Sequence, residues 1–512
     1  MNRILLKKDT AQSRYQKVNC STMKNNKRKS NHEIVACIYF FSALFFAMIA
    51  YMVYFVGFRA ADLMGNPYNA RTEVFNDQFI RGNILSSDGQ ILAKTEITEN
   101  KDQDGNATTI EKRVYPFGEV FAQAVGYSTK GKTGIESLTN FYLMKSSANP
   151  VARVANELTE TKSPGDNVTI SLDAGLQQTA YEALGDHAGA VIAMDPMTGY
   201  ILCMVSKPSF DPNTIVDAWD AIVNDPNQNG ELLNRCTQGL YAPGSTFKIF
   251  MTLAYLREHG DDPSGFQFNC TGAYQDPSDD KYIVHCFDGE VHGQEDLSEA
   301  FANSCNAAFS EMGTTIDRTE LRKLCDSMYF NEDLPIALTK SRSRFTVDAT
   351  TDTWTMMQTA IGQGNTMMSP LHSVLITAAI ANGGISMEPQ LLMQITSSDG
   401  EIVRTFNWQD GNRKTLMNQE EASVLASYMR KVVTDGTASR LRDASYEAAG
   451  KTGSAEVTKD GITKTNAWFT GFAPYSSPRI AVCVVVEDGE TGGRTAVPIA
   501  KKVMDYWIQK GQ

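Results

Sequence analysis

One uncharged segment near the start of the chain limits what the rest can become. Residues 34–58 read IVACIYFFSALFFAMIAYMVYFVGF and contain no charged side chain. As a helix that rises ~1.5 Å per residue, this segment is longer than the roughly 30 Å of a membrane hydrocarbon core. A cleaved signal peptide is the alternative, because Arg59, Ala60 and Ala61 follow, but its apolar region is usually only ~7–15 residues long. We therefore predict an uncleaved transmembrane helix over 34–58.

The charges around this segment predict its orientation. Residues 1–31 carry nine Lys or Arg side chains against one acid, Asp9, and basic flanks remain on the cytoplasmic side of a membrane. We expect a cytoplasmic tail over 1–33, a single-pass anchor in the cell membrane, and an extracytoplasmic body. Because the tail holds +8 of a net charge of −12, the rest of the chain carries about −20, which argues against nucleic acid as a main partner.

The stretch GYSTKGKTG (126–134) matches two catalytic patterns at once. It fits the G-x-x-x-x-G-K-[ST] loop that binds nucleotide phosphates, and it also ends in the K-T-G of serine acyltransferases. Asp195, after an apolar run, even resembles a magnesium ligand for the first pattern. However, the segment lies on the predicted outer side, and PMTG followed by YILCMV indicates a hairpin at Asp195. We interpret 126–134 as a structural loop.

A Ser-x-x-Lys pair supplies the first candidate catalytic element. Three such pairs occur: Ser21/Lys24 in the tail, Ser278/Lys281 in the polar loop DPSDDK, and Ser245/Lys248 in YAPGSTFKIFMTLAYL. In the last, Pro243 and Gly244 precede an expected helix, on which residues three apart share one face. A partly buried lysine can be neutral enough to activate a serine. We predict Ser245 as the nucleophile and Lys248 as its base.

A second element is Ser304-Cys305-Asn306 in AFANSCNAAF, where apolar neighbours predict a packed helix end. The Ser304 hydroxyl could relay a proton to the leaving group, and the Asn306 amide could hold a substrate amide. We expect Cys305 to be a packed neighbour rather than a catalyst.

The third element is Lys451-Thr452-Gly453-Ser454 in YEAAGKTGSAEV, on an expected strand that a ligand can approach closely. Lys451 and the hydroxyls of Thr452 and Ser454 would bind an anionic substrate terminus. The backbone N–H groups of Ser454 and Ser245 could form an oxyanion hole.

With these three elements in this order, the chain resembles the class B penicillin-binding proteins, which are membrane-anchored D,D-transpeptidases of peptidoglycan synthesis. The resemblance runs from Arg81 to the C-terminus. It includes RGNILSSDGQILA (81–93), GDNVTISLDAGLQ (165–177), GAVIAMDPMTGYILCMVSKPSFDPN (189–213), AIGQGNTMMSP (360–370), IANGG (380–384), DGTAS (435–439) and NAWFTGFAP (466–474). The family's membrane-proximal module has a G-x-x-G-x-E segment where this chain has 126–136. Cys305 and Ser454 depart from the residues most common there, but keep the groups that the chemistry needs.

The resemblance implies a mixed α+β fold. A β-rich, dimerisation-like pedestal would cover 59–160, and a transpeptidase domain with a mainly antiparallel sheet flanked by helices would cover 161–512. The sequence agrees at its end, where RIAVCVVVED (479–488) predicts a buried strand. A following helix would place Ala496, Ala500, Val503 and Trp507 on one face.

The resemblance also implies a two-step acyl transfer onto and off Ser245, with peptidoglycan stem peptides on lipid-linked glycan as substrate. β-Lactams would acylate the same serine, no metal or organic cofactor would be needed, and a SEDS-type glycan polymerase would be the membrane partner. A D,D-carboxypeptidase or β-lactamase would use the same acylation, and a penicillin-sensing receptor the same motifs. An intracellular P-loop ATPase is the remaining alternative.

The nine cysteines leave one question open. Cys270 and Cys286 flank one polar loop, so a disulfide between them and two separate, semi-buried thiols are both compatible with the sequence.

Overall fold

The computed structural model describes residues 32–55, 79–101, 107–148, 156, 158, 161–226, 229–459 and 462–511. The chain divides into two compact units, residues 1–69 and 70–512. In the first, the helix His32–Tyr54 is long and apolar enough to cross a membrane, with a mean hydropathy of 2.3. The basic tail before it and the last three residues of the predicted span lie outside the described residues.

The larger part of unit 70–512 is built around a five-stranded antiparallel sheet, in the order β17-β18-β19-β7-β8. Its strands are β17 (Ala449–Lys459), β18 (Ile462–Ala473), β19 (Ile480–Val486), β7 (Gly189–Met194) and β8 (Ile201–Lys207). Every residue of β19 is buried, so both faces of the sheet are covered. The predicted buried strand over 479–488 and the hairpin at Asp195 are both confirmed.

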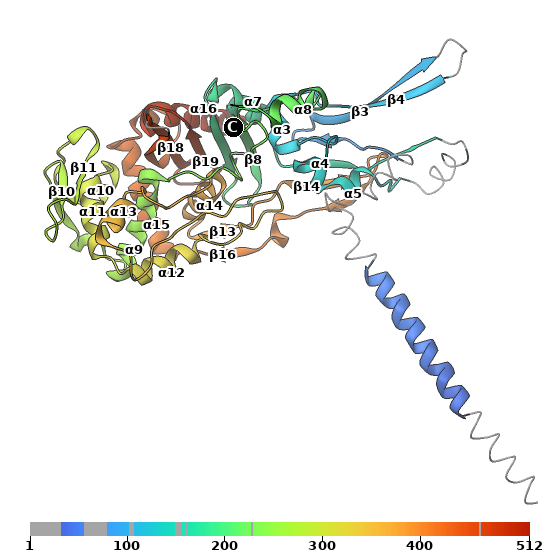
Figure 1. Cartoon of the computed structure of the whole chain (residues 1–512), viewed down its shortest axis with the longest axis horizontal. Coiled ribbons are helices and arrows are strands. Elements are labelled where there is room, and N and C mark those ends of the chain that lie inside the picture. The colour runs from blue at the N-terminus through green and yellow to red at the C-terminus, as the bar shows by residue number, and fades with distance from the viewer. Residues whose placement is uncertain are drawn as a thin grey trace, which may run out of the picture. The chain divides into compact units, whose positions relative to one another are not determined.

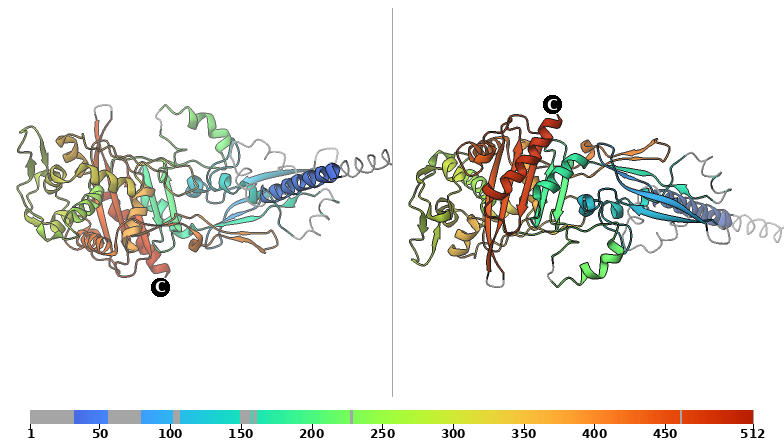
Figure 2. Two further views of the ribbon diagram at one scale, coloured as in Figure 1. Left: turned by 90° about the horizontal axis from the view of Figure 1, so that it is seen from below. Right: turned by 90° about the horizontal axis from the view of Figure 1, so that it is seen from above.

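Three helices cover this sheet. Helix α14 (Pro370–Ala381) packs on β19, β7 and β18, whereas α7 (Ala174–Leu184) and α16 (Val497–Lys510) pack against each other and on the opposite face. Figure 2 shows α16 lying across the strands. The expected inward residues Ala496, Ala500 and Val503 are buried, and Trp507 is partly buried. The predicted mixed fold with an antiparallel sheet flanked by helices is confirmed.

A second, six-stranded sheet has the order β15-β14-β6-β2-β3-β4. It combines β2 (Ile84–Leu85), β3 (Ile91–Lys101) and β4 (Ala107–Val114) with β6 (Asn167–Ile170), β14 (Leu392–Thr396) and β15 (Ile402–Thr405). The β3–β4 pair is the long ribbon at one end of this unit in Figure 1. Strands that follow residue 160 thus share one sheet with strands that precede it. The predicted domain boundary at 160/161 stays a prediction.

The remaining elements are short strands in two-stranded ladders, three helices before β5 and a group of helices between β8 and β17. The strands are β1 (Phe79–Ile80), β5 (Ser163–Pro164), β9 (Gln267–Cys270), β10 (Ala273–Gln275), β11 (Ile283–His285), β12 (Gly293–Asp296), β13 (Ile385–Met387) and β16 (Arg413–Thr415). The helices are α3 (Glu119–Val125), α4 (Gly134–Leu138), α5 (Asn140–Leu143), α8 (Ile215–Val223), α9 (Lys248–Glu258), α10 (Leu297–Ala302), α11 (Asn306–Thr315), α12 (Arg318–Ser327), α13 (Thr353–Ala360) and α15 (Gln419–Thr434).

The loop that resembles a nucleotide site joins α3 to α4 rather than a strand to a helix. Its two outer glycines lie where no side chain fits: a Cβ on Gly126 would lie 2.1 Å from the Thr133 carbonyl oxygen, and one on Gly134 would lie 2.4 Å from that of Ala124. Both have positive φ angles, which glycine adopts without strain. The glycines therefore serve a close backbone crossing, as the interpretation of a structural loop requires.

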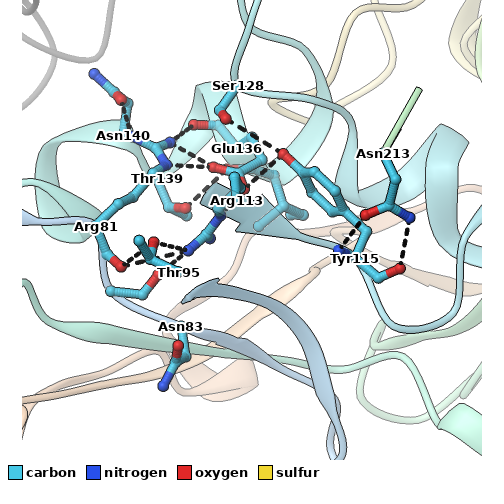
Figure 3. Close-up of polar contacts among 12 residues, drawn as sticks. Arg81, Asn83, Thr95, Arg113, Tyr115, Ser128, Glu136, Thr139, Asn140 and Asn213 are labelled. Carbon is cyan, nitrogen blue, oxygen red and sulfur yellow. Dashed lines mark hydrogen bonds and ion pairs between the residues drawn. The ribbon is translucent and has the colours of Figure 1, made fainter. Parts of the chain in front are cut away.

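Glu136, two residues beyond this loop, lies at the centre of a buried ionic network (Figure 3). Its carboxylate accepts hydrogen bonds from Arg81 Nε at 2.6 Å and Arg113 Nε at 2.8 Å. Arg113 also donates to the Gly82 carbonyl at 2.7 Å. Burial alone would raise the pKa of Glu136, but the two guanidinium groups hold that pKa below its ordinary value. The network joins two segments of the family resemblance, 81–93 and 126–136.

Glu136→Gln should destabilise this region, because it leaves two guanidinium groups buried without a carboxylate. We expect the free energy of unfolding to fall by about 3 kcal/mol, measured by urea unfolding of the full chain. Glu320→Gln removes an exposed carboxylate that pairs with Lys323 and should cost much less, because solvent screens that pair. Because the pKa of Glu136 is lowered, its contribution is present above pH ~4.3 and disappears as the pH falls through the lowered value. Equal effects of the two variants at neutral pH would contradict a structural role for the network.

Candidate functional site

A cleft of about 420 Å³ brings the three predicted elements together. Its lining includes Ser245, Ser304, Asn306, Thr452, Gly453 and Ser454. Lys248 and Lys451, the two lysines of the motifs, are fully buried behind these residues. Segments more than 140 residues apart in sequence, 304–306 and 451–454, thus share one wall.

Ser245 lies in a 3₁₀ turn, Gly244–Phe247, directly before α9. The sequence predicted a helix here, but the α-helix begins only at Lys248. The turn is packed closely: Gly244 N–H donates to the Gly362 carbonyl at 2.9 Å, and a Cβ on Gly362 would lie 1.8 Å from the Gly244 oxygen. Thr246 and Phe247 are buried. Ser245, which lines the cleft, is only half-buried. The turn therefore fixes the serine at the surface of the cleft.

Lys248 donates three hydrogen bonds, all to the second element. Its Nζ lies 2.6 Å from the Ser304 carbonyl oxygen, 3.3 Å from Ser304 Oγ and 2.9 Å from Asn306 Oδ1. Among the hydrogen bonds of the described residues, none joins this amine to Ser245 Oγ. Burial lowers the pKa of Lys248 to about 8, so roughly a tenth of this amine is neutral at pH 7, far more than for an ordinary lysine.

Ser304 occupies the turn between α10 and α11 and has a φ of 59°, which is uncommon for a residue other than glycine. Cys305 follows as the N-cap of α11, and its sulfur accepts a hydrogen bond from Ala308 N at 3.4 Å. The amide of Asn306 donates to the His285 carbonyl at 3.1 Å. The prediction of a packed helix end is correct in outline. Lys248, the His285 carbonyl and the backbone of α11 all form hydrogen bonds with this turn.

The third element lies on the edge strand β17, which pairs only with β18 among the described strands. Lys451 Nζ donates to Ser304 Oγ at 2.9 Å and to the Thr452 carbonyl at 3.1 Å. Burial, and then the nearby charge of Lys248, place the pKa of Lys451 well below its ordinary value. The Ser304 hydroxyl thus lies between two buried amines that cannot easily both be charged.

Gly453 allows this strand to approach the Ser245 turn. A Cβ there would lie 2.9 Å from the Pro243 carbonyl oxygen and 3.1 Å from Thr246. Ser454 Oγ accepts a hydrogen bond from Gly492 N at 3.2 Å. These contacts place the backbone of Ser454 against the turn that carries Ser245.

Several residues of the cleft were not singled out as site residues from the sequence. Thr437 shares a hydrogen bond between hydroxyl groups with Thr452, and the match at DGTAS (435–439) was the signal that could have found it. Arg440 and Arg494 add two cations to the lining, and no motif in the sequence marks them.

Cys270 and Cys286 come together, as the sequence allowed. Their sulfur atoms are 3.7 Å apart, whereas a disulfide bond is about 2.05 Å long. In this structure both are free thiols.

Comparisons with known proteins show to which family the chain belongs. Residues 189–505 match the family described as penicillin-binding protein transpeptidase domain, and residues 81–168 match the penicillin-binding protein A dimerisation domain. The peptidoglycan D,D-transpeptidase PbpA of Mycolicibacterium smegmatis is 32% identical over 483 residues, covering 89% of this chain and 94% of that protein.

Solved structures give the same result for the fold. Penicillin-binding protein A of M. tuberculosis, as a ceftriaxone acyl-enzyme complex, superposes with a TM-score of 0.74 at 28% identity, covering 85% of this chain and 99% of that chain. The D,D-transpeptidase domain of a peptidoglycan glycosyltransferase from Eggerthella lenta superposes with a TM-score of 0.72 at 27% identity, covering 84% and 98%.

Proposed function

Since this chain belongs to the family of penicillin-binding protein transpeptidases, we propose that it is a peptidoglycan D,D-transpeptidase that works through an acyl intermediate on Ser245. The observation that supports this most directly is the meeting of Ser245, the buried Lys248–Ser304–Lys451 group and the strand at Ser454 around one cleft. The substrate would be the D-Ala-D-Ala end of a stem peptide.

In the first step, Ser245 Oγ attacks the carbonyl carbon of the D-Ala-D-Ala bond as its proton passes to the neutral amine of Lys248. Lys248 must first move or rotate toward Ser245, because its present partners are Ser304 and Asn306. Hydrogen bonds between a nucleophile and its base are often long or misaligned in a free enzyme and shorten when substrate is bound. The N–H groups of Ser245 and Ser454 stabilise the developing oxyanion.

The C–N bond then breaks, and the leaving D-Ala amine takes a proton through Ser304 Oγ, which contacts both lysines. The substrate carboxylate lies against the hydroxyls of Thr452 and Ser454, with Lys451 buried behind them, while Asn306 holds a substrate amide. In the second step, an amine of a neighbouring stem peptide attacks the acyl-serine and forms the cross-link. β-Lactams acylate Ser245 in the same way, and their retained leaving group hinders this second attack.

Ser245→Ala tests the nucleophile. The full chain in detergent, incubated with benzylpenicillin, should gain one adduct by intact-protein mass spectrometry, and the variant should gain none. Ser278→Ala is the matched control, because Ser278 and Lys281 form the other Ser-x-x-Lys pair of the chain's body and should leave labelling unchanged. An adduct on folded Ser245→Ala protein would refute the assignment, and rapid loss of the natural adduct would indicate a β-lactamase.

The acylation rate should rise with pH through the pKa of Lys248, about 8, because only the neutral amine accepts a proton. Lys451, Glu295 and the thiols of Cys286 and Cys305 are the titratable groups that act on this amine. Stopped-flow measurements of penicillin acylation across pH 6–10 would give the profile. Lys248→Arg, which stays charged, should lower the rate by roughly 10²–10⁴-fold and remove the inflection. A flat profile in the natural chain would contradict Lys248 as the base.

We further propose that residues 34–58 anchor the chain, with the tail in the cytoplasm and unit 70–512 outside, where it would dock on a SEDS-type polymerase. The apolar helix and the nine basic residues before it support this orientation. Protease added to intact spheroplasts should digest the unit 70–512, and a cytoplasmic marker protein should survive. Protection of this unit until lysis would contradict the topology, and failure to co-purify with a SEDS protein would contradict only the partner.

A further inference from the structure

Three thiols and one imidazole meet at a point just behind the cleft. The sulfur of Cys286 lies 3.7 Å from that of Cys270 and 3.7 Å from that of Cys305. His292 Nδ1 lies 3.3 Å from the Cys270 sulfur and 3.9 Å from the Cys286 sulfur. All four ligand atoms lie within 4.8 Å of one another. The three cysteines are at most 3% exposed, and the His292 side chain is 8% exposed.

We propose that Cys270, Cys286, His292 and Cys305 bind one zinc ion. Zinc in structural sites takes four tetrahedral ligands, with Zn–S bonds of about 2.3 Å and Zn–N bonds of about 2.0–2.1 Å. In such a tetrahedron neighbouring sulfurs are about 3.8 Å apart, and sulfur and nitrogen about 3.6 Å apart. The two S···S distances that involve Cys286 match the first value, and the S···N distances from His292 Nδ1 to Cys270 and Cys286 lie on either side of the second.

The surroundings of the four side chains also fit a metal. Backbone N–H groups of Gly272 and Ala308 donate to the sulfurs of Cys270 and Cys305, each at 3.4 Å, which stabilises thiolate ligands. With Nδ1 directed at the thiols, His292 Nε2 lies 3.7 Å from the Glu290 carboxylate. A carboxylate beyond the second ring nitrogen is the usual partner of a metal-bound histidine.

A zinc ion explains why all four side chains converge, whereas a disulfide would explain the positions of only two of them. A Cys270–Cys286 bond would need the sulfurs to approach by more than an ångström, and Cys286 is equally near Cys305. Three thiolates with one imidazole in a tetrahedron favour zinc over harder cations such as Mg²⁺ or Ca²⁺. The thiol protons leave to solvent as the metal binds. This departs from the sequence-based expectation that no metal is needed.

The site would fix the catalytic cleft without taking part in the reaction. Cys305 stands between Ser304 and Asn306, which hold Lys248. Cys286 follows His285, whose carbonyl accepts from Asn306, and His292 itself lines the cleft. Zinc would therefore join the segments that carry Cys270, Cys286 and His292 to the turn at Ser304. The φ of 59° at Ser304 is an unfavourable backbone conformation that the surrounding structure must hold in place. With all four positions taken by protein, the ion has no place for substrate and is structural.

Metal analysis of the full chain, purified in detergent, tests the proposal without any activity. The natural chain should carry about one zinc ion after gel filtration. The double variant Cys270→Ser/Cys286→Ser and the single variant His292→Ala should carry almost none. Cys325→Ser, which changes a buried thiol outside the cluster, should keep its zinc. Zinc retained by the double variant would overturn the assignment.

Two measurements on the natural chain keep the test decisive if a variant does not fold. Cobalt added to metal-depleted chain should give thiolate charge-transfer absorption and the visible bands of a tetrahedral site. Alkylation followed by peptide mass spectrometry should find Cys270, Cys286 and Cys305 protected by zinc and reactive after chelation. Absence of both metal and cobalt spectrum, or a Cys270–Cys286 disulfide in the isolated chain, would overturn the proposal.

The link from the metal to the cleft rests on the proposed function and has its own readout. Chelation should lower the melting temperature and slow acylation by benzylpenicillin, and zinc should restore both. If zinc is bound but penicillin never labels the chain, the proposed function fails and the metal site stands.

Discussion

The cleft depends on two buried lysines that share one serine hydroxyl. Lys248 and Lys451 both donate to Ser304 Oγ, and no carboxylate is hydrogen-bonded to either amine among the described residues. Both amines are completely buried, so charge on either is costly, and charge on both is more so. Their pKa values fall for this reason. A proton acceptor at neutral pH is therefore a consequence of where the fold places these amines, as general-base chemistry requires.

That placement requires three backbone segments to lie closer together than side chains normally allow. The Ser245 turn fits between Gly362 and the strand at Gly453, and a Cβ on either glycine would collide with a backbone oxygen of the turn. Close packing without side chains leaves little freedom to shift. The positions of the serine and of the two lysines are thus set by main chain, which is the kind of support that a precise catalytic arrangement needs.

The sequence predicted the elements of this site better than their contacts. Spacing identified Ser245, Lys248, Ser304 and Lys451, because these motifs need fixed residue types at short range. It did not predict that Lys248 contacts Ser304 and Asn306 instead of Ser245, since that depends on a turn with positive φ at Ser304. Likewise, the family resemblance implied an antiparallel sheet and the apolar run at 479–488 predicted one of its strands, whereas the pairing of β14 with β6, over more than 200 residues, has no local signal.

The four metal-site residues failed to stand out for the same reason. Cys270 and Cys286 are near enough in sequence to suggest a pair, but Cys305 looked like ordinary packing and His292 has no motif. Only the antiparallel ladder of β9 and β12, which places Gly293 opposite Cys270, brings His292 to the thiols. Long-range register, rather than spacing along the chain, determines this cluster.

Two buried groups of ionisable side chains in unit 70–512, around Glu136 and around Ser304, show how charge balance separates structural support from chemistry. Around Glu136, two guanidinium groups meet a carboxylate through several hydrogen bonds, and the pKa of the acid moves further from neutrality. Around Ser304, the amines meet only neutral oxygens, and their pKa values move toward neutrality. A paired charge is fixed in one protonation state across the physiological range, while an unpaired one can exchange its proton there. The same desolvation thus makes the first network a structural support and the second a place where protons can be transferred.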